Sequence, residues 1–225
     1  MYPLPSAHRG PAVGTGGQAL RAPYMTSEPP PDLPFAFGWN TSWCAVRCSE
    51  PDRLVEELRL RNWRRTGWYE GVTLAQDTKA LFVSPEIGGW TLIVGNSLPF
   101  APNEEILDLL ADLSRVYGDA QYFGTSRVTE YHAWARAIDG RLRRAYAFSG
   151  EQGSVLWDRG PETQEEKDLG MIFQEETILT SSPDDSSVFR ISGRWSLDPS
   201  QIDNVTVQPG LGILGYRLEN RRPLS

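Results

Sequence analysis

The sequence of 225 residues contains only two cysteines, two histidines and two lysines. Cys44 and Cys48 fall four residues apart in one predicted strand. At ~3.3 Å per residue they lie roughly 13 Å apart, beyond the ~7 Å between Cα atoms that a disulfide allows. We therefore expect both thiols to be reduced and buried. Apart from His8 near the N-terminus, His132 is the only histidine, so a zinc site is not expected.

The chain also lacks any apolar run near the ~20 residues that cross a bilayer. Its first residues contain no apolar stretch of signal-peptide length. These two absences predict a cytoplasmic protein with no membrane partner. The formal net charge of -7 repels phosphate backbones, so no nucleic-acid partner is expected.

Several motifs of common enzymes are missing as well. The sequence has no P-loop, no G-x-S-x-G nucleophile motif and no H-E-x-x-H helix. Its 29 acidic residues leave a paired-carboxylate reaction open without giving it specific support. We expect no cofactor, and the inventory favours a binding protein over an enzyme.

What the chain does contain is enough apolar material for a core, with 40% hydrophobic and 11% aromatic residues. Eight of the 17 prolines precede Phe35, so residues 1–34 cannot sustain helix or sheet hydrogen bonds. This segment is predicted to be a disordered Pro/Gly-rich leader. Residues 35–225 are predicted to form a single α+β domain.

Alternating and helical hydrophobic patterns follow one another along this domain. Two principal helices are predicted, one capped by Ser49 and one that begins near Asn103 and ends at Gly118. Strands are predicted at 43–48, 71–76, 80–84, 90–95, 120–124, 128–138, 141–148 and 154–157. The order strand-helix-strand-strand thus occurs in residues 43–84 and again in 90–158. It predicts a mainly antiparallel sheet shared by two related units.

The hydrophobic patterns weaken beyond residue 160. Thr163 and Glu166 indicate a short capped helix, and Asp184 or Asp185 is predicted to cap another that runs to about Trp195. Residues 160–225 are expected to wrap around the core through four apolar anchors, which are Trp195, Leu197, Ile213 and Leu214.

A two-residue turn, Asp139-Gly140, predicts a β-hairpin in which facing residue numbers sum to 279. This register places Arg136 opposite Arg143, and two facing guanidinium groups repel unless an anion lies between them. One interpretation is that Glu130, Asp158 or another acidic neighbour supplies the anion. The alternative is a small-anion site in which both arginines bind the ligand, with Trp134 as a wall and His132 as a hydrogen-bond donor.

A second candidate site is a surface for a protein partner. Trp63 on one side and Trp68 and Tyr69 on the other flank the pair Arg64-Arg65 in a segment without periodicity, which is typical of exposed aromatic anchors, although core packing is the alternative. The outer side of the predicted helix after Asn103 is acidic, and its N-terminal position also suits the helix dipole. The carboxylates that we assign to the partner surface are Glu104, Glu105, Asp108 and Asp112.

Four short motifs resemble segments of uncharacterised bacterial proteins: GWTLIVG at 89–95, QYFGT at 121–125, YHAWAR at 131–136 and GRWSLDP at 193–199. Such small, acidic, Trp-rich α+β chains are similar to immunity proteins that neutralise interbacterial toxins. The resemblance covers about residues 35–200 and implies a binding protein whose partner is a cognate toxin. The alternative function is an anion sensor or enzyme that uses the face of His132, Arg136 and Arg143.

Overall fold

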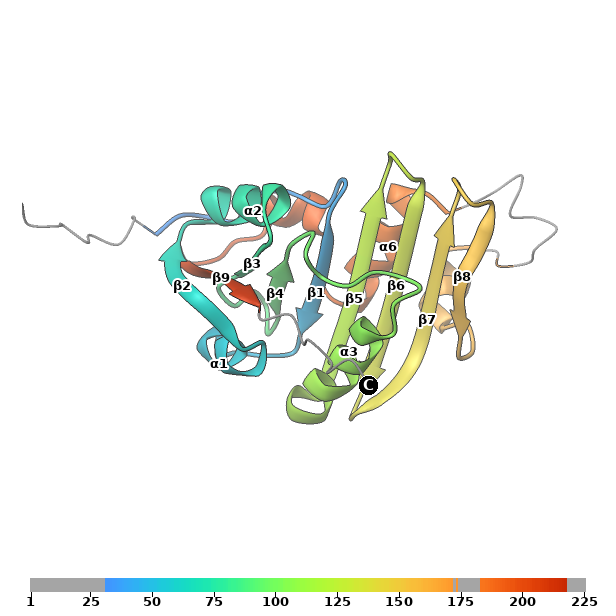
Figure 1. Cartoon of the computed structure of the whole chain (residues 1–225), viewed down its shortest axis with the longest axis horizontal. Helices are drawn as coiled ribbons and strands as arrows, with labels where there is room; N and C mark the ends of the chain where they lie inside the picture. Colours follow the sequence, from blue (N-terminus) through green and yellow to red (C-terminus); the bar gives the residue numbers. More distant parts are fainter. Residues whose placement is uncertain (1–30, 172, 174–182, 218–225) are drawn as a thin grey trace, which may run out of the picture.

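The computed structural model describes residues 31–171, 173 and 183–217. They form one nine-stranded sheet in the order β2-β9-β3-β4-β1-β5-β6-β7-β8 (Figure 1). Every pair of neighbouring strands is antiparallel, which confirms the predicted α+β class. The strands are β1 Ser42–Val46, β2 Leu60–Thr66, β3 Ala80–Val83, β4 Thr91–Val94, β5 Asp119–Ser126, β6 Tyr131–Ile138, β7 Arg141–Ser149, β8 Ser154–Arg159 and β9 Gly212–Arg217.

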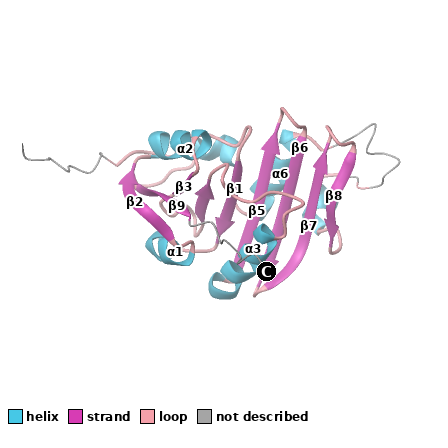
Figure 2. Ribbon diagram, in the orientation of Figure 1, coloured by secondary structure: helices cyan, strands magenta, loops and turns pink. Residues whose placement is uncertain are grey.

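Helices cover both faces of the sheet (Figure 2). The apolar residues of α1 and α3 share one buried cluster, and those of α2 and α6 share another with the opposite sides of the strands. Figure 1 shows α3 in front of the strands and α6 behind them. The helices are α1 Pro51–Glu57, α2 Trp68–Asp77, α3 Glu105–Tyr117, α4 Gln164–Asp168 and α6 Asp185–Trp195, with a 3-10 helix η1 at Pro199–Asn204. None of the described helices is both long and apolar enough to cross a bilayer.

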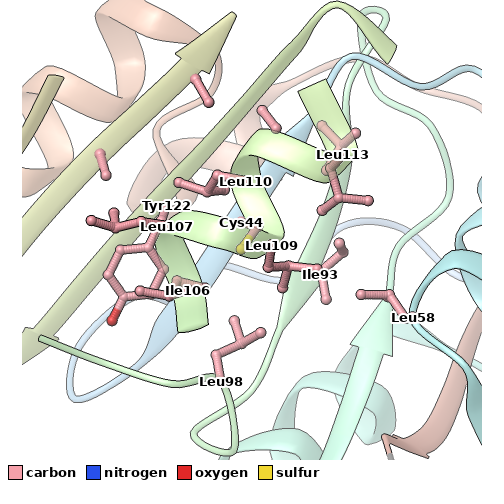
Figure 3. Close-up of a cluster of buried hydrophobic side chains, with 14 of the residues drawn as sticks. Cys44, Leu58, Ile93, Leu98, Ile106, Leu107, Leu109, Leu110, Leu113 and Tyr122 are labelled. Carbon is pink, nitrogen blue, oxygen red and sulfur yellow. The ribbon is translucent and has the colours of Figure 1, made fainter. Parts of the chain in front are cut away.

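Helix α3 packs on the sheet through the stripe that the sequence predicts. Ile106, Leu110 and Leu113 are buried against residues of the central strands, among them Cys44 and Tyr122 (Figure 3). Its cap differs slightly from the prediction, because the N-cap residue is the one after Asn103. The Asn103 side chain still accepts a hydrogen bond from the backbone N–H of Glu105 at 2.9 Å. Gly118 ends the helix with a φ of 85°, as predicted.

The strand predicted at 71–76 is wrong, because these residues belong to α2. Val72 and Leu74 alternate with polar residues, as they would in a strand. However, Trp68, Val72 and Ala75 recur at helical spacing and are all buried. Gly71 permits the close packing: a Cβ atom there would lie 2.2 Å from the ring of Phe82 in β3.

Strand β2 at 60–66 was not predicted, and it changes the first unit. The order β1, α1, β2, β3 survives in residues 42–83, but α2 is inserted between the last two strands. Strand β9 lies between β2 and β3, so the C-terminal segment is part of the sheet. Ile213 and Leu214 are buried there, on opposite faces. Trp195 and Leu197 pack in the cluster beneath α6, so all four predicted anchors contact the core.

The caps of the smaller helices differ in how well they were predicted. Ser49 does not cap α1, whose N-cap is Glu50 without a side-chain hydrogen bond. Thr163 and Glu166 form the predicted capping box of α4. Asp184 caps α6, which ends at Trp195 as expected.

The folded part of the chain begins before residue 35. The backbone carbonyl of Asp32 accepts a hydrogen bond from Gly210 at 3.0 Å. The Asp32 side chain also accepts one from the backbone N–H of Trp68 at 2.6 Å. Gly67, the N-cap of α2, has no side chain, so Asp32 supplies the cap from another part of the chain. The boundary predicted at residue 34 is therefore too late, and residues 1–30 lie outside the described residues.

Candidate functional site

A groove of about 990 Å³ runs between α1 and α3, and we call it the acidic groove. Its position follows from the packing of both helices on the same face of the sheet. Their apolar residues point inward, so their polar residues line the space between them. The charged lining residues are Glu56, Glu57, Arg59, Glu104, Glu105, Asp108, Asp112, Arg115 and Arg217.

The four acidic residues predicted on the second helix all line this groove. The prediction missed Glu56 and Glu57, at the C-terminal end of α1. Arg217, at the end of β9, was also missed. The signal that could have pointed to α1 was its acidic pair beside Leu58, but only tertiary packing brings α1 next to α3.

Ion pairs neutralise part of the acidic groove. Arg115 binds Asp112 at 2.7 Å, and both side chains are exposed. Arg159 of β8 binds Glu104 through two hydrogen bonds of 2.6 and 2.8 Å. Arg217 lies 3.6 Å from Glu105.

Three carboxylates of the groove remain without an ion pair. Among the described residues, Glu56, Glu57 and Asp108 form no ion pair, and all three are exposed. The groove therefore carries a surplus of negative charge that is open to solvent.

Comparison with known proteins gave no significant match to a family model, a curated protein or a solved structure. The resemblance to immunity proteins therefore stays a prediction.

The two predicted aromatic anchors do not lie in the acidic groove. Trp68 is only 1% exposed and packs edge-on against Phe82 at 5.4 Å, so it is a core residue rather than a surface anchor. Tyr69 is 63% exposed and contacts Phe35 at 5.1 Å. Both aromatic residues belong to α2, which packs on the other face of the sheet from α1 and α3. The structure thus separates the aromatic and the acidic parts of the predicted partner surface.

The predicted strand face around Arg136 is also rearranged. Next to the turn, Ile138 pairs with Arg141 and Ala137 with Leu142, as the turn predicts. A β-bulge then leaves Arg143 as an extra residue on β7, and Arg136 pairs with Arg144. The predicted opposition of Arg136 and Arg143 is wrong, because one inserted residue moves every later side chain of β7 to the other face.

Arg144 is consequently buried, with 1% exposure, on the same face as Trp134. Its guanidinium donates to the Glu166 carboxylate of α4 at 2.9 Å and also pairs with Asp158. The indole N–H of Trp134 donates to the same carboxylate at 2.7 Å. Glu166 closes the network by accepting from the backbone N–H of Thr163 at 2.6 Å. This buried network attaches α4 to the sheet.

The two arginines of the predicted anion site do not come together. One is neutralised by acidic neighbours and the other is exposed to solvent. Arg136 binds Asp119 at 2.7 Å and lies 3.9 Å from Glu165. Arg143 is exposed. The interpretation that acidic neighbours supply the anion holds for Arg136 alone. Asp158 pairs with Arg144 instead, and Arg143 forms no ion pair with a described residue. The geometry does not form a site in which both predicted arginines bind one ligand.

His132 lies on β6 and is buried beside the N-terminus of α6. Its Nδ1 atom is 3.8 Å from the nearer carboxylate oxygen of Asp185. Burial lowers the pKa of His132 below 6.5, although Asp185, Asp184 and Glu130 oppose this effect. The imidazole is therefore mainly neutral at neutral pH.

Both cysteines are free and buried, as the sequence predicted. Burial raises the pKa of Cys44 to about 12 and also raises the pKa of Cys48. The thiolate that nucleophilic chemistry needs is therefore disfavoured at both cysteines at neutral pH. Within the described ranges, no three His, Cys, Asp or Glu residues come together in a way that could hold a metal ion.

Proposed function

We propose that this chain is a binding and inhibitory protein whose acidic groove receives a basic surface of a partner protein. The more specific form of the proposal is an immunity protein that neutralises an interbacterial toxin by direct binding. The observation that carries the proposal is the groove between α1 and α3, in which six carboxylates face three arginines.

The negative charge of the groove favours a basic protein partner, because it raises the rate of association. Carboxylates gathered in a hollow attract a basic surface at long range and speed the encounter. Glu56, Glu57 and Asp108 are available for new ion pairs, because the arginines that form ion pairs at the groove bind Asp112, Glu104 and Glu105 instead. A partner arginine that enters the groove can form charge-assisted hydrogen bonds with these carboxylates.

The groove is attached to a rigid part of the fold. Leu109 and Leu113 line it and are also buried in the cluster under α3 (Figure 3). The carboxylates therefore lie on a preformed helix pair, which lowers the entropy that binding would otherwise cost. An inhibitor that occludes a toxin needs such a preformed surface.

We would test the proposal by expressing the chain with the product of an adjacent toxin-like gene. We predict that the wild type restores growth and binds that product, and that a Glu56→Lys, Asp108→Lys variant loses both. The matched control is Asp77→Lys, Glu151→Lys, which changes the net charge equally at two exposed residues outside the groove. Circular dichroism would establish that both variants are folded.

The expected loss of affinity is at least about tenfold, because each reversal replaces attraction by repulsion at a contact. Raising the salt concentration should weaken wild-type binding more than it weakens binding by the groove variant. Equal protection by both variants would show that the groove is not the interface. Failure of the wild type to bind any neighbouring gene product would reject the immunity function.

A further inference from the structure

A second hollow, of about 390 Å³, lies at one end of the sheet, and we call it the hydroxyl pocket. It shares no lining residue with the acidic groove. Only one of its thirteen lining residues, Glu151, is charged, whereas charged residues make up 23% of the whole chain. A pocket so poor in charge suits an uncharged ligand. Six lining residues carry hydroxyl groups: Ser42, Thr125, Ser126, Thr129, Tyr131 and Ser149.

Three hydroxyl groups form a chain that begins and ends at the wall of this pocket. The Ser42 hydroxyl lies 3.3 Å from that of Tyr122, and the Tyr122 hydroxyl lies 3.3 Å from that of Tyr131. The backbone N–H of Ala101 donates to the Tyr131 hydroxyl at 3.1 Å. Ser42 and Tyr131 line the pocket, while Tyr122 is fully buried behind them.

The number of protons on these three hydroxyl groups leaves one hydrogen-bond donor for the pocket. Three hydroxyl groups have three protons, and the two bonds between them use two. Leaving the third proton on buried Tyr122 without an acceptor would cost ~1–3 kcal/mol, so it belongs to Ser42 or Tyr131. Burial raises the pKa of Tyr131 to about 12, which keeps this hydroxyl protonated at neutral pH. At one end, Ser42 or Tyr131, an O–H group is therefore left without an acceptor among the described residues, and both residues line the pocket.

An aromatic ring forms part of the wall. Phe100 lines the pocket and is 60% exposed, which is unusual for a phenylalanine. Its ring meets Tyr131 edge-on, with centroids 5.9 Å apart and an interplanar angle of 72°. The exposed ring surface offers an apolar contact at a pocket that is otherwise rich in hydroxyl and carboxamide groups. The Asn96 carboxamide is already bonded to Ser42, Asn40 and Gln76, whereas the Gln152 side chain forms no hydrogen bond with a described residue.

We propose that the hydroxyl pocket binds an uncharged saccharide through stacking on Phe100 and hydrogen bonds to the hydroxyl and amide groups. A sugar ring has C–H groups on its faces and hydroxyl groups at its edge, so it needs both kinds of contact at once. The pocket volume lies at the lower end of the ~300–1,000 Å³ range of ligand sites, which suits one or two sugar rings. This site is independent of the proposed function of the acidic groove.

The test is a titration of the full chain by calorimetry and saturation-transfer NMR. The probes are glucose, N-acetylglucosamine, cellobiose and chitobiose, with glucuronic acid as the anionic comparison. We expect at least one neutral sugar to bind, and glucuronic acid to bind less well because Glu151 repels it. Phe100→Ala should weaken the binding at least about tenfold. Phe100→Trp should preserve it, because the larger ring still stacks.

Tyr69→Ala is the matched control, since it removes an equally exposed aromatic ring outside the pocket. It should leave the sugar affinity unchanged. The inference fails if none of the four neutral sugars binds the wild type at ~10 mM, well above a Kd of ~1 mM. It also fails if Phe100→Ala binds the sugar as tightly as the wild type does.

Discussion

Arg144 and Glu166 form an ion pair that solvent does not reach, with exposed fractions of 1% and 0%. Removing the arginine would leave the Glu166 charge buried with hydrogen bonds from Trp134 and Thr163 but without a cation. We predict that Arg144→Met lowers the free energy of unfolding by about 3–5 kcal/mol, since breaking a buried pair leaves an uncompensated charge.

The matched control for this prediction is Arg159→Met, which removes the same type of side chain from a pair with Glu104 that is half exposed. Exposed pairs contribute about 0–1 kcal/mol. Urea unfolding of both variants would measure the difference. Similar losses in the two variants would contradict the special role of the buried pair.

Protonation of a single residue, His132, makes the free energy of unfolding depend on pH. Its pKa in the folded protein is lowered by burial, while the unfolded chain has the ordinary value near 6.5. The unfolded state therefore takes up a proton first as the pH falls. The contribution of His132 to the free energy of unfolding is therefore complete above about pH 6.5. It decreases as the pH falls from 6.5 through the lower pKa of the folded state.

We predict that His132→Gln removes this dependence. Unfolding free energies at about pH 7.5 and about pH 5 should differ less in the variant than in the wild type. Asp184, whose pKa is lowered from 3.8 because hydrogen bonds outweigh the effect of burial, loses its contribution only at more acidic pH. Identical pH profiles for the two proteins would show that His132 is not the titrating group.

At the scale of elements, helix α2 depends on a residue far away in the sequence. Asp32 accepts the hydrogen bond from Trp68 that Gly67 cannot accept with a side chain. We predict that Asp32→Ala lowers the free energy of unfolding by about 1 kcal/mol, the usual contribution of a helix cap. Asp32→Asn keeps an acceptor oxygen and should cost less. Leu33→Ala, at an exposed neighbour, is the control, and an equal loss there would argue against capping.

The same helix packs so closely on β3 that position 71 has no room for a side chain. A methyl group on Gly71 would overlap the ring of Phe82 at 2.2 Å. We predict that Gly71→Ala lowers the stability by about 1–3 kcal/mol, although alanine is the better helix former. Tyr69→Ala on the exposed side of α2 should change little. A stabilised Gly71→Ala variant in thermal unfolding would contradict this packing.

The elements also show what a sequence can reveal. Helix α3 was predictable because its apolar residues recur along one side and Gly118 ends it. Helix α2 was not, since Val72 and Leu74 alternate with polar residues and its cap comes from Asp32. The acidic side of α3 was identified as a candidate site, but the groove also needs Glu56 and Glu57 of α1. The bulge at Arg143 made the predicted register of the hairpin wrong beyond the first two pairs, because a turn motif defines only the pairs next to it.

At the scale of the whole molecule, an antiparallel sheet with helices on both faces buries nearly every strand. Only the outermost strands, β2 and β8, have an unpaired edge among the described strands. Strand β2 protects its edge with Arg61, Arg64 and Arg65 and with a bulge between Arg61 and Arg64. Charged residues and bulges at such an edge oppose pairing with a second chain, which keeps the sheet from extending into aggregates.

The position of β9 governs when the sheet can be completed during synthesis. Strand β2 has β9 as its only neighbour in the sheet, so it cannot hydrogen-bond there until residues 212–217 have left the ribosome. At ~5–20 residues per second, β2 waits on the order of ten seconds for its partner. The seven strands from β3 to β8 in the order of the sheet can pair earlier. In pulse-labelling hydrogen exchange, the amides of β2 should therefore gain protection no sooner than those of β9. Until β9 is synthesised, β2 is an unpaired strand of the nascent chain and is exposed to pairing with a strand other than β9.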